Sequence, residues 1–288
     1  MTQDLYDIPL YRPPSEANSL ILQLTIGCSH NKCTFCTMYK AKKYREKSTE
    51  EIKEHINRAK QNHLIADKIF LADGNVLVME TEKLLSIIEK LYKQFPKLRR
   101  VTCYAGPRDI LAKSEDQLLA LKDAGLKMLY LGVESGSTEI LRNVNKGVSA
   151  DEMVEAGQKV KKCGINLSCM IISGLGGQSL WETHAVESAK VINSISPRFL
   201  SLLTLYIDGG TVLEKEIAAG NFKLLSPRQI LEETKLMLEN LQVNNCIFRS
   251  NHASNYIALQ GTLNKDKAKL IKQVNAALNS KEFKEGCH

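Results

Sequence analysis

The chain has 288 residues, of which 43% are hydrophobic and 25% charged, and a barrel-type α/β domain of about 250 residues fits this length. No stretch approaches the roughly 18 to 20 apolar residues of a membrane-spanning helix, and the polar start at Met1 is not typical of a signal peptide, so we expect a cytoplasmic protein without a membrane segment. The formal net charge of +7 would attract an acidic partner, but no stripe of Lys and Arg interleaved with aromatic residues predicts nucleic-acid binding.

Short apolar runs alternate along the chain with longer segments of helical period, which is the pattern of repeated βα units. The predicted strands are Leu20–Ile26, Lys68–Ala72, Arg100–Ala105, Met128–Val133, Asn166–Ser173 and Phe199–Ile207. Parallel strands in this number suit an open barrel, so we expect an α/β fold with a partial (β/α)6 barrel.

The helices between these strands are predicted from their apolar faces and from their first turns. Residues at helical spacing form two apolar stripes, Leu84, Leu85, Ile87, Ile88 and Leu91 in one, and Ile230, Thr234, Leu238 and Leu241 in the other. Capping boxes, in which a hydroxyl and a side chain three residues later satisfy free backbone donors, are predicted at Ser48/Glu51, Ser114/Gln117, Ser149/Glu152 and Ser226/Gln229. Pro227 suits the first turn of its helix.

No repeat, low-complexity tract or linker divides the chain, so we expect one core with two additions. Residues 1–19 form an amino-terminal arm, 20–240 the core barrel, and 241–288 a carboxy-terminal extension packed on the core. The arm carries Tyr11, Arg12 and Glu16, for which we expect a solvated position, with a cover over the site as the alternative. The extension ends in a predicted helix over Lys265–Ser280.

Three closely spaced cysteines, Cys28, Cys33 and Cys36, follow the first predicted strand. Three thiolates can hold a [4Fe–4S] cluster and leave its fourth iron open for another ligand. One alternative is a zinc site with His30 as fourth ligand, and another is an electron-transfer cluster, which would need a fourth cysteine. The chain would then be a metal-stabilised binding or redox-sensing protein. The other five of the eight cysteines lack a CxxC pairing, so they complete neither alternative.

The cysteine motif resembles that of the radical S-adenosylmethionine (radical SAM) superfamily. It has the two-residue gap before Cys36 and the aromatic residue, Phe35, that precedes the last cysteine in that superfamily. It departs from the usual pattern by having four residues, instead of three, between Cys28 and Cys33. Because loops tolerate insertions, we expect the departure to alter the loop and not the ligands.

Later segments are similar to the branch of oxygen-independent coproporphyrinogen oxidase, Elongator-type enzymes and methylthiotransferases. The resemblance implies that the turn Asp73, Gly74 and Asn75 holds the amino group of SAM, since an ammonium needs oxygen acceptors. It also implies that Glu134, in Gly-Val-Glu-Ser-Gly, accepts hydrogen bonds from the ribose hydroxyls, with Ser135 beside it. An ordinary turn and a strand cap are the structural alternatives.

The fifth predicted strand runs into a glycine-rich turn that again resembles this branch. By that resemblance, Ile171 or Ile172 would supply an apolar wall for adenine, and Gly174 would let the backbone approach the cofactor. A tight connection between a strand and a helix is the alternative.

The superfamily resemblance implies the cofactors, a [4Fe–4S] cluster and SAM, and the reaction. An electron from the reduced cluster would cleave SAM to methionine and a 5′-deoxyadenosyl radical, which would abstract hydrogen from a substrate. The expected electron donor is a flavodoxin or a ferredoxin. The substrate is unidentified, and we expect a small molecule in preference to RNA.

Candidate substrate contacts are Arg249, His252 and Asn255 near the end of the chain, and Arg108 after the third predicted strand. An arginine binds a carboxylate or phosphate, and a histidine transfers a proton. The alternatives are a hydrogen-bonded loop that closes the barrel for the first three and a surface ion pair for Arg108.

Overall fold

The computed structural model describes residues 5–62 and 65–280. The ends of the predicted arm and extension, and Cys287 with them, lie outside these residues. The chain divides into two units, which are described one at a time. The first unit comprises Met1–Asn31, Cys36–Leu131 and Lys159–Asn166, and the second comprises Lys32–Phe35, Gly132–Gln158 and Leu167–His288.

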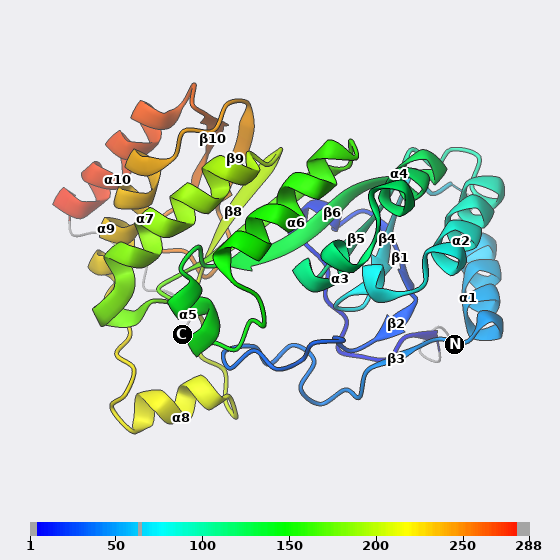
Figure 1. Cartoon of the computed structure of the whole chain (residues 1–288), viewed down its shortest axis with the longest axis horizontal. Coiled ribbons are helices and arrows are strands. Elements are labelled where there is room, and N and C mark those ends of the chain that lie inside the picture. The colour runs from blue at the N-terminus through cyan, green and yellow to red at the C-terminus, as the bar shows by residue number, and fades with distance from the viewer. Residues whose placement is uncertain (1–4, 63–64, 281–288) are drawn as a thin grey trace. The chain divides into compact units, whose positions relative to one another are not determined.

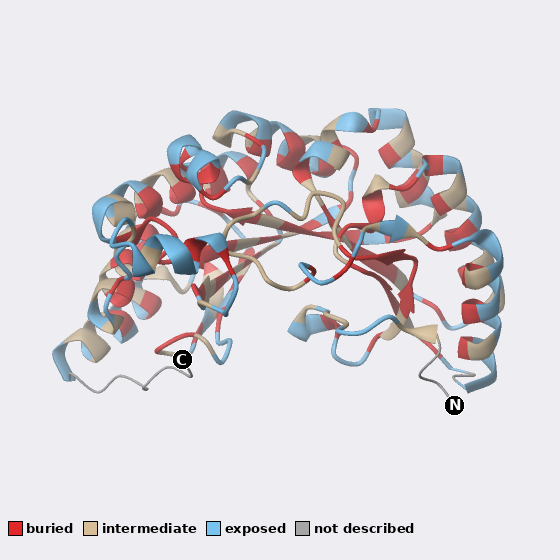
Figure 2. Ribbon diagram, turned by 90° about the horizontal axis from the view of Figure 1, so that it is seen from below, coloured by how far each residue is buried: buried red, intermediate tan, exposed pale blue. Residues whose placement is uncertain are grey.

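The first unit is built on parallel strands that are buried because their residues are almost all apolar (Figures 1 and 2). In sheet order the strands are β1 (Leu20–Gln23), β4 (Lys68–Ala72), β5 (Arg100–Ala105) and β6 (Leu126–Glu134). A short antiparallel ribbon joins β2 (Thr25–Ile26) to β3 (Arg45–Glu46). Parallel neighbours end at one edge, so the loops after β1, β4 and β5 gather there.

Amphipathic helices cover the strands of the first unit, each with one buried and one exposed face (Figure 2). They are α1 (Thr49–Asn62), α2 (Thr81–Gln94), α3 (Pro107–Ala112) and α4 (Glu115–Ala124), with short 3-10 turns η2 (Pro14–Glu16) and η3 (Val76–Val78). The capping box of Ser114 and Gln117 is confirmed at the start of α4, and reciprocal bonds join Ser48 and Glu51 before α1.

The amino-terminal arm is not solvated at Glu16, contrary to the sequence prediction. Glu16 is fully buried and accepts hydrogen bonds from Arg100 Nη2 at 2.9 Å, from Tyr130 Oη at 2.6 Å and from Ser19 Oγ. Tyr6 Oη donates to the Ile21 carbonyl at 2.8 Å. A buried carboxylate needs such partners, so the arm is fixed along the first strand.

The second unit contains three parallel strands and one antiparallel strand. They are β7 (Asn166–Ser173), β8 (Phe199–Thr204), β9 (Cys246–Ser250) and β10 (Leu259–Leu263), with β10 antiparallel to β9. Its helices are α5 (Thr138–Asn143), α6 (Ala150–Lys162), α7 (Gly177–Ile195), α8 (Val212–Ala218), α9 (Pro227–Asn240) and α10 (Lys267–Ser280). Helix α9 packs between α7 and α10 (Figure 1). The capping box of Ser226 and Gln229 is confirmed at the start of α9, and Pro227 lies in its first turn.

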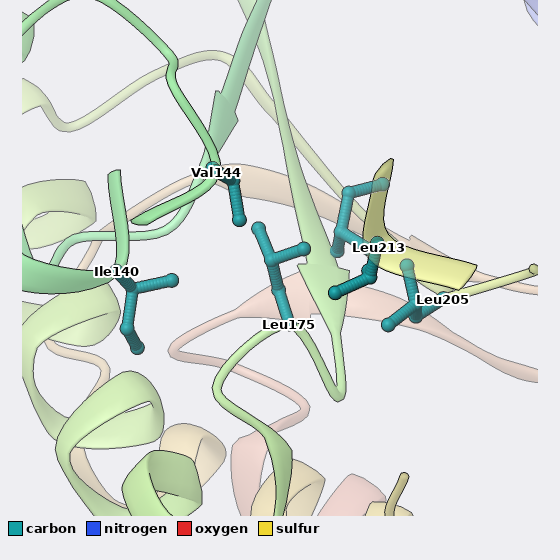
Figure 3. Close-up of a cluster of buried hydrophobic side chains, with 6 residues drawn as sticks. Ile140, Val144, Leu175, Leu205 and Leu213 are labelled. Carbon is teal, nitrogen blue, oxygen red and sulfur yellow. The ribbon is translucent and has the colours of Figure 1, made fainter. Parts of the chain in front are cut away.

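An apolar cluster holds the strand ends of the second unit together. Ile140, Val144, Leu175, Leu205 and Leu213 point toward one another from α5, the loops after β7 and β8, and α8 (Figure 3). Phe35 packs against this cluster. The aromatic residue of the cysteine motif is therefore anchored by the core of the second unit.

The α/β fold and its mainly parallel strands are confirmed, and the bounds of β4, β5 and β7 are as predicted. The first predicted strand is wrong in one respect, because it divides at Leu24 into β1, which pairs with β4, and β2, which pairs with β3. The last predicted strand ends at Thr204. The domain boundaries at 19/20 and 240/241 stay predictions. Within the described residues, no helix is long and apolar enough to span a membrane.

Candidate functional site

The cysteine loop begins directly after β2, where Gly27 turns the chain into Cys28. Gly27 has a φ of +75°, which glycine adopts without strain. Its carbonyl accepts a hydrogen bond from the Gly74 amide at 3.2 Å. A Cβ on Gly74 would lie 2.6 Å from the Tyr39 ring and 3.1 Å from the Cys28 Cβ. The absence of a side chain at Gly74 therefore lets the turn after β4 pack directly against Cys28.

Cys33 lies in the part of the loop that belongs to the second unit. The neighbouring Thr34 donates its amide to the Val144 carbonyl at 3.0 Å and accepts from the Leu213 amide at 3.1 Å. Phe35 adds its contact with the apolar cluster. Two backbone hydrogen bonds and one aromatic ring thus fix the middle of the motif.

The three predicted ligands, Cys28, Cys33 and Cys36, are half-buried and present as thiols. Within the described ranges, no three His, Cys, Asp or Glu side chains surround a point where a single metal ion would bind. A [4Fe–4S] cluster makes a different demand, because each thiolate binds a separate iron. The motif offers the donor type that such a cluster takes.

Asp73 follows β4 and holds the cysteine loop with one of its oxygens. Its Oδ2 accepts from Lys42 Nζ at 3.0 Å, Gln23 Nε2 at 3.0 Å and the Gly27 amide at 3.1 Å. The Lys42 side chain is 4% exposed and that of Asp73 is 0% exposed, so this is a buried ion pair. Asp73 Oδ1 is also buried and has no hydrogen-bond partner in the described part of the chain. Burial and the interaction of the Tyr39 hydroxyl with the same carboxylate raise the pKa of Tyr39, so a ligand donor at Oδ1 would share Asp73 with Tyr39.

The Asn75 side chain joins the loops after β2, β4 and β5. Its Nδ2 donates to Ser29 Oγ at 2.8 Å and to the Asp109 carboxylate, and its Oδ1 accepts from the Gly106 amide at 3.0 Å. The amide oxygen that was predicted to bind SAM thus already has one donor, and only its second lone pair remains.

Glu134 ends β6 in a left-handed conformation with a φ of +63°, which is uncommon for a residue with a Cβ. Its Oε1 accepts from Lys146 Nζ at 2.8 Å. A Cβ on Gly132 would lie 2.0 Å from the same oxygen, so only glycine leaves room for this carboxylate. Glu134 Oε2 is buried and without a partner among the described residues. An unusual backbone and an unfilled buried acceptor together favour a binding role.

Ser135 is fully buried and contacts a histidine that the sequence analysis did not single out. Its Oγ lies 2.9 Å from His184 Nδ1 and accepts from the Ser137 amide at 3.1 Å. His184 Nε2 lies 3.0 Å from the Ile172 carbonyl. Burial lowers the pKa of His184 to about 4, so the ring is neutral at pH 7. A neutral ring satisfies both contacts by donating from Nε2 to Ile172 and accepting from Ser135 at Nδ1.

Gly174 lies in the turn after β7 and contacts a second residue that was missed, Glu233. The Gly174 amide donates to Glu233 Oε1 at 2.9 Å, and His184 Nε2 lies 3.9 Å from that oxygen. Burial raises the pKa of Glu233 to about 8, and the neutral acid avoids a buried charge. The signal was present in the sequence, because Glu233 lies three residues after Ile230 on the apolar face of its helix.

The four substrate candidates are in different environments. Arg108, Arg249 and His252 are exposed, and Asn255 is buried. Arg249 donates to the carbonyl before it at 2.8 Å, and His252 Nδ1 lies 2.8 Å from Ser254 Oγ. The three exposed side chains are in reach of a ligand from solvent.

Asn255 differs because the protein fills its hydrogen-bonding capacity. Its Oδ1 accepts from the Thr204 amide at 2.8 Å and from Thr204 Oγ1 at 3.0 Å. Its Nδ2 donates to the Leu202 carbonyl at 2.8 Å and to Ser250 Oγ at 3.0 Å. These four contacts favour the alternative in which Asn255 fastens the loop after β9 to β8.

Comparison with known proteins decides the family, because the radical SAM superfamily model matches residues 22–188. This chain belongs to the radical SAM superfamily. Members of this superfamily are enzymes that bind a [4Fe–4S] cluster and SAM and generally need a reductant. The matched segment includes the three cysteines, both buried carboxylates and the turn after β7.

Two curated relatives of this radical SAM protein show how far the likeness extends. It is 27% identical over 168 residues to 4′-phospho-dehydrooxetanocin synthase of Priestia megaterium, covering 52% of this chain and 22% of that protein. It is 23% identical over 180 residues to the heme chaperone HemW of Bacillus subtilis, and the match covers 61% of this chain and 46% of that protein. The chain thus spans less than half the length of either relative.

Among solved structures, methylornithine synthase (PylB) shares the fold of the radical SAM protein. The TM-score is 0.54 at 17% identity, with 90% of this chain and 81% of that chain covered. At this identity the likeness shows the fold alone. The residues present also fit the family's cofactors, since the matched segment offers three half-buried thiols and the buried carboxylates Asp73 and Glu134, each with one oxygen that has no partner in the described part of the chain.

Proposed function

We propose that this chain cleaves SAM reductively at a [4Fe–4S] cluster held by Cys28, Cys33 and Cys36, and that the resulting radical abstracts hydrogen from a substrate. When bound, the cluster supplies the electron and SAM supplies the 5′-deoxyadenosyl group. The observation that carries the proposal is that two buried carboxylate oxygens in the segment matching the superfamily, Asp73 Oδ1 and Glu134 Oε2, have no hydrogen-bond partner among the residues described. Buried acceptors normally have a donor, and a bound ligand would supply one.

The turn of Asp73, Gly74 and Asn75 would hold the ammonium of SAM. Asp73 Oδ1 supplies a charged acceptor, and the Asn75 amide oxygen keeps one lone pair for a second hydrogen bond. Gly74 keeps this turn in contact with the cysteine loop. This arrangement supports binding of the amino group near Cys28, within the first unit.

The second unit would hold the nucleoside of SAM. Glu134 Oε2 accepts a ribose hydroxyl in this proposal, while Oε1 stays bonded to Lys146. Ile172 and the turn at Gly174 supply an apolar wall and close backbone for adenine, and Ser135 supports the Glu134 turn through His184. Phe35 fixes the cysteine loop against the same unit.

The partners follow from the chemistry and the charge of the chain. We infer a flavodoxin or ferredoxin as the donor, because the cluster needs single electrons and an acidic carrier suits a net charge of +7. A small molecule is the preferred substrate, with an anionic group bound by Arg108 or Arg249 and a proton handled by His252. The seven described cysteines are thiols, which suits the reducing cytoplasm.

Anaerobic reconstitution with iron and sulfide tests the proposal. The wild type should take up about four irons per chain and, with dithionite and SAM, release 5′-deoxyadenosine and methionine. Alanine at Cys28, Cys33 or Cys36 should abolish both the intact cluster and the release. Cys163→Ala, which removes a thiol outside the motif, is the matched control and should behave as wild type.

Two results would contradict the proposal. One is copurification of zinc in place of iron, with no 5′-deoxyadenosine formed. The other is full activity of the Cys33→Ala variant, which would show that the ligands are assigned wrongly.

A further inference from the structure

Two fully buried ionisable side chains lie behind the proposed nucleoside site, and the proposed reaction does not use either. His184 is on α7 and Glu233 is on α9, and both side chains are 0% exposed. Burying an ionisable side chain costs free energy, so such groups are rarely fully buried unless they are paired or hydrogen-bonded. The His184 and Glu233 contacts all lie within the second unit.

His184 connects the turn after β6 to the end of β7. Its Nδ1 faces Ser135 Oγ at 2.9 Å, and its Nε2 faces the Ile172 carbonyl at 3.0 Å. Ser135 directly follows Glu134, and Ile172 was predicted to form the adenine wall. One imidazole thus contacts both segments that would hold the nucleoside.

The turn after β6 packs directly against the backbone of α7. Ser188 Oγ accepts from the Gly136 amide at 2.8 Å. A Cβ on Gly136 would lie 2.2 Å from the Glu187 carbonyl oxygen, so the turn and the helix touch at their backbones. A change in α7 at His184 is therefore transmitted to the Glu134 turn through direct contact.

Glu233 holds the other segment from the opposite side. Its Oε1 accepts from the Gly174 amide at 2.9 Å, where Gly174 has a φ of +86°. A Cβ on Gly174 would lie 2.9 Å from Ile230 Cδ1, one turn before Glu233 on α9. His184 Nε2 lies 3.9 Å from the same Oε1. The two side chains therefore form one continuous set of contacts from Ser135 to Gly174.

We propose that His184 and Glu233 are positioning residues that join the turn at Glu134–Ser137 to the turn at Gly174, so that the two turns bind the nucleoside of SAM as one rigid unit. This inference rests on the proposed function and adds to it the residues that preorganise the site. Their role is inferred from their hydrogen bonds to the two turns, which His184 makes with both ring nitrogens and Glu233 with Oε1; Glu233 Oε2 is buried without a partner among the described residues. Their effect is on affinity for the nucleoside and on the mobility of the two turns.

The test combines ligand binding with hydrogen exchange in the full chain. The binding probe is S-adenosylhomocysteine, titrated calorimetrically into protein without a cluster, so the readout is independent of turnover. Glu233→Leu removes the acceptor of the Gly174 amide, and Glu233→Gln keeps an acceptor of the same shape. We expect the leucine variant to bind about tenfold more weakly and the glutamine variant to bind within about twofold of wild type.

Hydrogen exchange measures the coupling without any ligand. In Glu233→Leu we expect faster exchange both at Gly174 and at the more distant Gly136, whereas Glu233→Gln should protect both amides as in wild type. Ser135→Ala, a milder change on the other side of His184, should likewise accelerate exchange at Gly174. Glu232→Leu is the matched control, because Glu232 lies on the same helix, is partly exposed and pairs with Arg228.

The outcomes separate this inference from the proposed function. Wild-type protein that binds no S-adenosylhomocysteine and releases no 5′-deoxyadenosine contradicts the proposed function, and the positioning role fails with it. Wild type that binds while Glu233→Leu binds equally well overturns the positioning role alone. Equal losses in the leucine and glutamine variants, or faster exchange confined to Gly174, would also overturn it.

Discussion

The turn after β4 in the first unit and the turn after β6 in the second both hold a buried carboxylate, but they stabilise it by different contacts. The carboxylates are those of Asp73 and Glu134; within residues 5–62 and 65–280, one oxygen of each is paired with a lysine and the other has no hydrogen-bond partner. Asp73 uses its paired oxygen for three donors, one of which is the buried cation of Lys42. The Glu134 carboxylate accepts from Lys146, and its backbone is left-handed. Asp73 therefore stabilises the surrounding fold through its hydrogen bonds, whereas the position of Glu134 is set by the backbone of its turn.

The second unit also contains a buried acid of another kind. Glu233 has no lysine or arginine partner among its described contacts, and burial raises its pKa to about 8. Asp73 and Glu134 are each paired with a cation. A buried carboxylate can therefore be stabilised by a neighbouring cation or by being protonated. The two cases should respond differently to mutation and to pH.

The largest expected effect is loss of stability in Asp73→Asn, because this change removes the buried carboxylate beside Lys42 and leaves that cation with the partly exposed Asp7 carboxylate at 3.1 Å. We expect the free energy of unfolding to fall by about 3 kcal/mol, measured by urea denaturation. A second change, Lys42→Met, should restore much of the loss. Asp67→Asn is the control, since Asp67 pairs with Arg99 at the surface, and its effect should be small. An Asp73→Asn protein as stable as wild type would remove the distinction between the two turns.

The next effect concerns the pH dependence of stability in the second unit. Glu233 has a pKa of about 8 when folded and an ordinary value of 4.5, so the folded state holds an extra proton between these values. Stability therefore falls as pH rises toward 8. His184, with a folded pKa of about 4 against 6.5, acts in the opposite sense below pH 6.5. Below pH 6.5 the contributions of His184 and Glu233 to stability oppose each other, and above pH 6.5 the contribution of Glu233 acts alone.

Between pH 6.5 and 8 the Glu233 contribution should lower the free energy of unfolding by about 1.5 kcal/mol. Glu233→Gln should remove this part of the decline, while Glu232→Gln should follow wild type. Urea denaturation at several pH values measures both. If Glu233→Gln shows the same decline as wild type, the buried acid is ionised at neutral pH and the contrast with Asp73 is wrong.

Gly132→Ala should displace the Glu134 carboxylate, since a Cβ would lie 2.0 Å from Oε1. We expect affinity for SAM to fall about tenfold, because a displaced acceptor loses the hydrogen bond to the ribose. The iron content should stay the same. Gly209→Ala is the matched control, as nothing lies within 4 Å of a Cβ there. Unchanged affinity in Gly132→Ala would mean that Glu134 does not bind SAM.

The smallest expected effect is that of Lys146→Met, which removes the cation from Glu134 Oε1. The side chains are 12% and 9% exposed, so the pair is partly solvated and its loss should lower SAM affinity by about threefold. Calorimetric titration at pH 7 measures the change. A loss larger than that of Gly132→Ala would show that Lys146 itself contacts SAM.

The sequence predicted six strand segments and singled out the two carboxylates because they carry local signals, namely apolar runs and motifs at strand ends, but it did not predict β3, β9 and β10. It did not predict the roles of His184 and Glu233, which lie within helices. The spacing of apolar residues indicates which face of a helix is buried, but it does not show which polar residues on that face make specific hydrogen bonds. Asn255 was predicted as a substrate contact from its type and neighbours. Only the folded structure shows that Thr204, Leu202 and Ser250 use its hydrogen bonds.

The arm was misjudged for a similar reason. Glu16 is a charged residue near a chain end, and its partners Arg100 and Tyr130 are 84 and 114 residues away. No local pattern reports such a contact. Long-range hydrogen bonds of buried charges are therefore the part of this fold that the sequence alone does not indicate.

The most direct test compares affinity for SAM with affinity for 5′-methylthioadenosine, which has the nucleoside but lacks the ammonium. If Asp73 binds the ammonium and Glu134 the ribose, Asp73→Asn combined with Lys42→Met should weaken SAM binding and leave 5′-methylthioadenosine binding unchanged. Gly132→Ala should weaken both by the same factor. Equal losses for both ligands in the Asp73 variant, or a loss for SAM alone in Gly132→Ala, would contradict the assignment of the two turns.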